Sequence, residues 1–179
     1  MAILLRFSGL IDRLSEIIGK FSGYLVLICC LVSAGNALIR YAFNISSNGW
    51  LEIQWYMFAF IVLMGAAHTL RLNEHVRVDL IYGSVSDKTR LWIDVIGIIV
   101  FLIPACAYLA WICWPVFWLS FAQGEVSSNA GGLIRWPVKF IICAGFALLV
   151  LQGLSELVKR VAALLGLAAI DTTYEKPLQ

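Results

Sequence analysis

Charged side chains are scarce in this chain. They make up 13% of its 179 residues, while apolar residues make up 61%. Soluble globular domains have about a quarter charged residues and about half apolar ones. The shortage of charge therefore excludes a soluble protein and indicates an integral membrane protein. A net charge of +2 is also too small to suggest that the chain binds nucleic acid.

The sequence patterns of enzymes and metal proteins are missing as well. There is no glycine-rich phosphate loop, no nucleophile elbow and no metal-ligand spacing. No Asp, Glu, Lys or Arg falls in the middle of a long apolar run, where membrane enzymes and transporters place their working groups. We therefore expect neither catalysis nor a bound metal or cofactor.

Histidine and cysteine are present but are poorly placed for chemistry. His68 and His75 are seven residues apart near one end of the same predicted span, so they cannot sandwich a haem within one chain. The cysteines include no C-x-x-C pair, which argues against a redox motif or a disulfide framework. We expect small buried side chains at all five positions: Cys29, Cys30, Cys106, Cys113 and Cys143.

What the chain does contain is four long runs without charge, at residues 21–39, 53–70, 95–124 and 140–155. A membrane-spanning helix needs about 20 apolar residues, and the last run reaches that length because Lys139 can extend its ammonium group to the interface. We predict an all-α integral membrane protein with four transmembrane helices, at about 20–40, 52–71, 92–122 and 136–158. They form a single domain over residues 1–170, followed by a disordered tail at 171–179.

The third run is too long for a straight span. As a helix, its 30 residues measure about 45 Å, against a hydrocarbon core of about 30 Å. It must tilt, bend, project or break, and Pro104 and Pro115 are the predicted bends. A re-entrant pair of shorter helices is the alternative.

Interfacial amphipathic helices are expected at the N-terminus, in the second loop and at the C-terminus. Over residues 3–18, apolar side chains recur at helical spacing, which is typical of a helix lying on the membrane surface: Ile3, Phe7, Leu10, Leu14 and Ile17. A cleaved signal peptide is the competing interpretation, because Val32-Ser33-Ala34 resembles a cleavage site. The lead-in of about 20 residues is too long and too polar for that.

The basic residues predict the orientation. Ten Lys and Arg fall on the side that holds both termini and the second loop, and three fall on the other side. The side rich in Lys and Arg is cytoplasmic, so we predict an N-in and C-in topology. If the third run were a re-entrant pair, nine Lys and Arg residues would lie on the cytoplasmic side and four on the other side.

Polar side chains gather at the two ends of the first two spans. The predicted outer end holds Asn36, Arg40 and Glu52, and the predicted inner end holds Arg71, His75, Arg77 and Asp79. An amide or charge close to burial needs a partner on another helix or subunit, so we expect both groups to contact a partner. The alternatives are that Asn36 lies among the headgroups and that the inner loop is solvated.

An aromatic ridge is the last candidate for a contact surface. Tyr108, Trp111 and Trp118 fall on one stripe of the third span, with Trp114 beside it. Such a ridge faces either lipid, where tryptophan is common, or another protein. We include Trp111 and Trp118 among the candidate partner contacts.

Three segments in order resemble the small membrane subunit of tripartite ATP-independent periplasmic (TRAP) transporters. They are NALIRYAF, then WLEIQWYMFAFIVLMGAAHTLRLNEHVRVD, then GEVSSNAGGLIRWPVKFIICAGFALLVLQGLSEL after a long third span. The resemblance extends over roughly residues 20 to 160. It departs from the family at Leu51 and Ile53, since members often have a second acidic residue beside the position of Glu52.

The resemblance implies a subunit of the bacterial inner membrane that neither binds nor moves substrate. It implies a large multispanning partner driven by the sodium gradient, and a periplasmic binding protein that captures an organic acid. The small subunit would enlarge the stationary scaffold, surrounded by membrane lipids. A haem- or quinone-associated membrane anchor and a self-contained small transporter are the alternatives; the first would show haem absorbance, and the second would move solute alone.

Overall fold

The computed structural model describes residues 2–45, 47–74 and 85–167. Four helical stretches in it are long and apolar enough to cross a membrane, and each contains one predicted span. The predicted all-α membrane fold with four spans is therefore confirmed. The helices are α1 (Ala2–Phe43), α2 (Asn48–Leu72), α4 (Asp87–Gly97), a π-helical turn η1 (Ile98–Leu102), α5 (Ile103–Gln123) and α6 (Trp136–Leu164).

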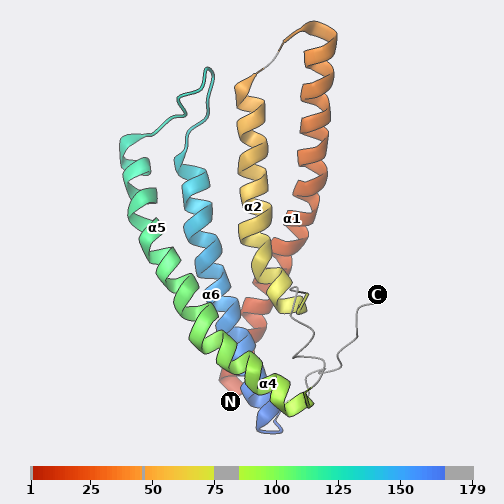
Figure 1. Cartoon of the computed structure of the whole chain (residues 1–179), viewed down its shortest axis with the longest axis vertical. Coiled ribbons are helices and arrows are strands. Elements are labelled where there is room, and N and C mark those ends of the chain that lie inside the picture. The colour runs from red at the N-terminus through yellow and green to blue at the C-terminus, as the bar shows by residue number, and fades with distance from the viewer. Residues whose placement is uncertain (1, 46, 75–84, 168–179) are drawn as a thin grey trace.

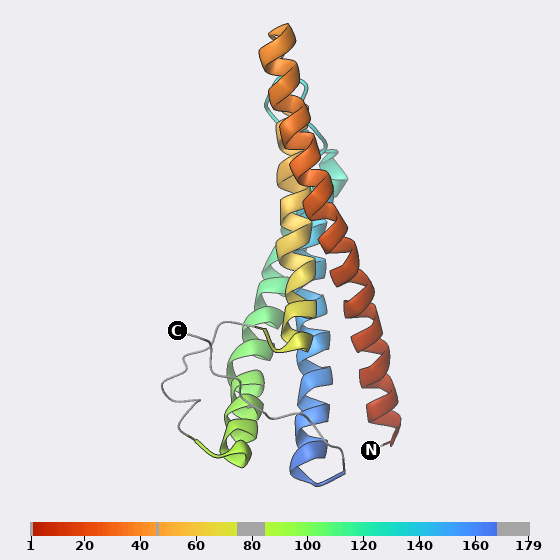
Figure 2. The ribbon, with the colours of Figure 1, turned by 90° about the vertical axis from the view of Figure 1, so that its right-hand side faces the viewer.

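The helices run side by side as an elongated bundle (Figure 1). Helix α6 packs against α1, α2 and α5, and α1 also packs against α2. The end of α1, the start of α2 and the loop at residues 124–135 lie at one end of the bundle, which we name the loop end (Figure 1). The start of α1, the start of α4 and the end of α6 lie at the other, which we name the N-terminal end (Figures 1 and 2).

The long third run is continuous from residue 87 to residue 123 and does not double back. Its irregularity is the π-helical turn at Ile98–Leu102, directly before Pro104 in the first turn of α5. Proline lacks the amide hydrogen that an interior helical position needs, and a wider turn accommodates this. The second predicted bend, Pro115, lies inside α5.

The predicted N-terminal helix and the first span form one helix without a break. Helix α1 has 42 residues, which is about 63 Å and about twice the hydrocarbon thickness. Its inward face is lined with small polar residues: Ser8, Ser15 and Ser22 are buried, with Ile11 between them. Serines at every seventh position let α1 approach its neighbours closely and supply hydroxyl groups to them.

Glycines allow the closest helix crossings. A Cβ on Gly145 of α6 would lie 2.8 Å from Leu63 Cβ and 3.0 Å from the Leu63 backbone carbon of α2. A Cβ on Gly19 of α1 would lie 2.2 Å from the ring of His68. The α1–α2 and α2–α6 contacts therefore need these glycines, whereas Gly23 has nothing within 4 Å of its Cβ position.

We expect Gly145→Ala to destabilise the bundle by about 1–3 kcal/mol, the usual result of overpacking, because the Leu63 backbone cannot give way. The measurement is thermal unfolding of the purified protein in detergent. Gly23→Ala is the matched control and should melt at the wild-type temperature or above. Equal melting of the two variants would contradict the observed α2–α6 crossing.

Candidate functional site

The described part of the molecule has two clusters of hydrogen-bonded polar side chains, which we name polar centres, and the first surrounds Glu52. Glu52 lies one turn into α2 and is 3% exposed. Its carboxylate accepts hydrogen bonds from the Leu133 amide at 2.7 Å, from Asn129 Nδ2 at 2.8 Å and from the Ser127 hydroxyl. Burying a carboxylate is costly unless its oxygens are hydrogen-bonded. These three donors, with the positive end of the α2 dipole nearby, offset that cost.

The loop at residues 124–135 folds into a small cradle around this carboxylate. Val126 and Ile134 form an antiparallel bridge, and the Ser127 amide donates to the Leu133 carbonyl at 2.9 Å. Gly131 has φ +69°, and a Cβ on Gly132 would lie 2.5 Å from Ser127 Cβ. The glycines therefore allow the tight turn that aims three donors at Glu52.

A second carboxylate fixes the base of the cradle. Glu125 pairs with Lys139 of α6, and its other oxygen lies 3.6 Å from Arg135. The Lys139 ammonium, aided by the charge of Arg135, holds the pKa of the Glu125 carboxyl below its usual range. The loop is thus tied to α2 through Glu52 and to α6 through Glu125.

The structure does not bring the other two predicted outer residues into this cradle. Asn36 is half-buried and Arg40 is exposed on the last turn of α1. Within the described part of the chain, neither side chain has a hydrogen-bond or ion-pair partner. The polar atoms of Glu52, in contrast, are hydrogen-bonded to other described residues of the chain.

The second polar centre lies near the N-terminal end and surrounds Gln152 of α6, which is fully buried. Its side-chain oxygen accepts from Ser15 Oγ at 2.7 Å, and its Nε2 donates to Asp12 Oδ1 at 2.9 Å and to Glu156 Oε1 at 3.1 Å. Both N–H groups of the side-chain amide therefore donate, and its oxygen accepts one hydrogen bond. Gln152 joins α1 to α6 far from either helix end.

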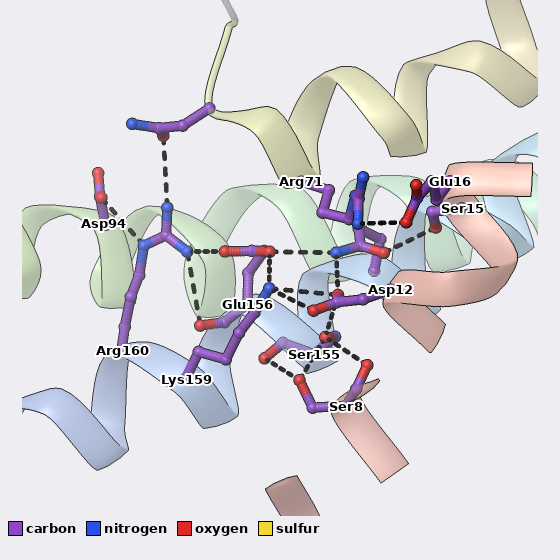
Figure 3. A network of polar contacts seen from close by, with 12 residues as sticks. Ser8, Asp12, Ser15, Glu16, Arg71, Asp94, Ser155, Glu156, Lys159 and Arg160 are labelled. Carbon is purple, nitrogen blue, oxygen red and sulfur yellow. Dashed lines mark hydrogen bonds and ion pairs between the residues drawn. The ribbon is translucent and has the colours of Figure 1, made fainter. Parts of the chain in front are cut away.

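Asp12 continues this centre along α1 (Figure 3). It accepts from Lys159 Nζ at 2.9 Å and from Ser155 Oγ at 2.8 Å. The Ser155 and Ser8 hydroxyl oxygens are 2.6 Å apart. Because Ser8, Asp12 and Ser15 share the inward face of α1, the helix is fixed to α6 over two turns.

A chain of ion pairs extends the network to the other helices. Arg160 pairs with Glu156 and donates from Nε to Asp94 Oδ2 of α4 at 3.0 Å, and Glu156 also pairs with Lys159. Arg71 of α2 lies 3.3 Å from Glu16 of α1 (Figure 3). Among the described residues, the ion pairs near this end join five anions with five cations: Asp12, Glu16, Asp87, Asp94 and Glu156 with Lys20, Arg71, Arg90, Lys159 and Arg160.

Of the predicted inner residues, Arg71 takes part in this network, whereas His75, Arg77 and Asp79 lie outside the described residues. Sequence reasoning missed the Gln152 centre entirely. The sequence pattern that could have predicted this centre is a stripe of polar residues at helical spacing on two otherwise apolar helices. The residues are Ser8, Asp12 and Ser15 on α1, and Gln152, Ser155, Glu156 and Lys159 on α6. Such stripes predict a helix contact, but they do not name the partner helix.

The aromatic ridge is uncovered in the isolated chain, since Trp111 is 77% and Trp118 is 57% exposed. Behind it, Phe117 is buried against Phe140 of α6, with ring centroids 5.2 Å apart. Among the described residues, no group of three or more His, Cys, Asp or Glu side chains is placed to hold a metal ion.

Fold and polar centres together define a multi-pass membrane protein whose polar groups tie its helices together at two levels. Over residues 29–163, the sequence matches the family described as Tripartite ATP-independent periplasmic transporters, DctQ component. The match covers most of the chain, which therefore belongs to this family of small TRAP transporter membrane components, as its sequence motifs indicated. No curated protein and no solved structure matches the chain.

We expect Glu52→Ala to release the cradle. Leu133 would lose its acceptor, and a hydrogen bond to a charged group is worth about 1.5–3 kcal/mol, so its amide should exchange about tenfold faster or more. The measurement is hydrogen exchange resolved over residues 124–135. Glu74→Ala, which removes an exposed carboxylate, is the control and should leave exchange there unchanged. Unchanged exchange in Glu52→Ala would show that the carboxylate does not hold the loop.

We expect Lys159→Met to lower stability by about 1–3 kcal/mol, because Asp12 and Glu156 keep their charge and lose a cation. Adding Asp12→Asn should restore part of the loss, and thermal unfolding in detergent measures the coupling. Lys20→Met is the control. Lys20 is paired with Glu16, but its side chain is 68% exposed, so this substitution should lower stability by well under about 1 kcal/mol. Strictly additive effects of the two network substitutions would contradict the pairing.

Proposed function

We propose that this chain is the non-catalytic small subunit of a sodium-driven, binding-protein-dependent transporter for organic acids. It acts as a scaffold for a large multispanning transport subunit, which works with a periplasmic substrate-binding protein. One observation supports the scaffold role. In both polar centres, around Glu52 and around Gln152, the buried polar side chains bond to other parts of this chain and hold its elements together. The outer apolar faces remain uncovered.

The region between the two polar centres supports a stationary role. Residues 21–39, 53–70, 95–124 and 140–155 contain no Asp, Glu, Lys or Arg. A subunit that moved ions or acids would need such groups along the path. Substrate and sodium binding therefore belong to the large subunit and to the binding protein.

The proposed orientation places the loop end in the periplasm and the N-terminal end in the cytoplasm of a bacterial inner membrane. Four spans return the chain to the side on which it began. The N-terminal end also carries most of the Lys and Arg residues, as cytoplasmic segments do. The cradle around Glu52 then faces the compartment of the binding protein.

The proposed partner contacts follow from exposure. Asn36 and Arg40 offer polar groups without partners in the described chain near the loop end, and Glu52 contributes by shaping the cradle. Trp111 and Trp118 offer an apolar ridge for the large subunit or for lipid. At the inner end we retain Arg71, His75, Arg77 and Asp79 as a brace, the last three outside the described residues.

The test is co-expression of the small and large subunits, with purification through a tag on the small one and uptake assays with the binding protein in liposomes. Wild type should retain the large subunit, and uptake should need sodium and both membrane subunits. Arg40→Ala should reduce uptake several-fold, whereas Lys88→Ala, which removes an exposed cation from α4, should not. Sodium-dependent uptake by the large subunit alone, at the full rate, would refute the scaffold role.

A further inference from the structure

The outer face of the first half of α1 carries an apolar seam with a basic edge. Five side chains repeat at alternating steps of four and three residues, the spacing of the a and d positions of a coiled coil. They are Ile3, Phe7, Leu10, Leu14 and Ile17. Each is between 45% and 83% exposed, so no described part of the chain covers the seam.

The basic edge follows the same period. Arg6, Arg13 and Lys20 are exposed and are seven residues apart, directly before the a positions. These are the g positions, whose charges set partner choice in a coiled coil. Lys20 bonds to Glu16 at 2.8 Å, but within the described chain Arg6 and Arg13 form no ion pair.

From this pattern we propose that a helix of the large subunit, with an apolar seam and carboxylates at seven-residue intervals along one edge, packs against residues 3–20 of α1. The inference rests on the proposed function, because the partner is the large subunit. It adds which surface binds that subunit and which chemistry the partner helix has.

The membrane surface does not match this pattern. Because α1 continues unbroken from Ala2 to Phe43, its first half shares the direction of the span and cannot lie flat in the interface (Figure 2). Arg6 and Lys20 are then about 21 Å apart along the helix, while the headgroup layer of one leaflet is about 5–8 Å thick. Lipid phosphates could reach one of the three cations, but a helix running alongside reaches all of them.

A second copy of this chain does not match it either. In an antiparallel pair, the three basic g positions of the two copies would face one another and repel. In a parallel pair they would face the e positions Leu4, Ile11 and Ile18, which offer no acceptor. The carboxylates of this stretch are already engaged, Asp12 with Lys159 and Glu16 with Lys20 and Arg71.

The first experiment places a photo-crosslinking amino acid at Leu10 in the complete complex of small and large subunits. Irradiation should link it to one helix of the large subunit that contains regularly spaced Asp or Glu. Gly9 is the control position: it is exposed, has nothing within 4 Å of its Cβ position, and points away from the seam. It should give a much weaker link.

The second experiment tests the charges. Arg6→Glu with Arg13→Glu should lower the amount of large subunit that copurifies by about tenfold, or ~1.4 kcal/mol. Changing the carboxylates of the crosslinked helix to Lys should restore it. Arg13→Glu alone should reduce copurification, whereas Lys88→Glu, the same change of charge on exposed α4, should leave it unchanged.

The outcomes separate this inference from the function on which it rests. If the wild-type chain copurifies with the large subunit while Leu10 links only to lipid or to a second copy, the docking surface is wrong and the scaffold role stands. Equal copurification of the charge-reversed and wild-type chains also refutes the docking surface. If the wild-type chain does not copurify with the large subunit at all, the proposed function fails, and this inference fails with it.

Discussion

A buried side-chain amide needs partners, and the way Gln152 obtains them determines much of this structure. In an apolar environment an unpaired amide costs several kcal/mol, and Gln152 is completely enclosed in the middle of α6. It is satisfied only when Ser15 and Asp12 of α1 lie opposite it. That requirement fixes the register of α1 on α6 and places the serine face of α1 inward. The large apolar side chains of α1 are left on its outer face.

The two polar centres solve the same physical problem with different means. Near the N-terminal end, anions and cations neutralise one another in ion pairs that join α1 to α6, α4 to α6 and α2 to α1. At the loop end a single carboxylate, Glu52, is satisfied by a backbone amide and two neutral side chains. The first arrangement holds helices to one another, and the second holds a loop in shape. Both arrangements stiffen the chain, which agrees with the scaffold role that we propose for it.

Much of the fold could be predicted because its signals are local. Hydrophobic length located the four spans, and the prolines indicated an irregular third span. That irregularity takes the form of a π-helical turn directly ahead of Pro104, where Leu102 approaches Gly153 of α6 closely. The site was predicted less completely. Glu52 was expected to be close to burial, but its acceptor role toward residues 127–133 could not be read from spacing, since those donors lie about 80 positions away.

The sequence by itself determined that this chain is a four-span membrane protein of the DctQ family, with apolar span centres and charge at their ends. Those properties depend on composition and spacing along one helix at a time. Only the tertiary structure decided which polar groups meet. Ser15 and Gln152 are 137 residues apart in the chain, and their contact depends on where two helices cross. The same crossing decides which face of α1 is left free, because a helix hides only the side that its neighbours reach.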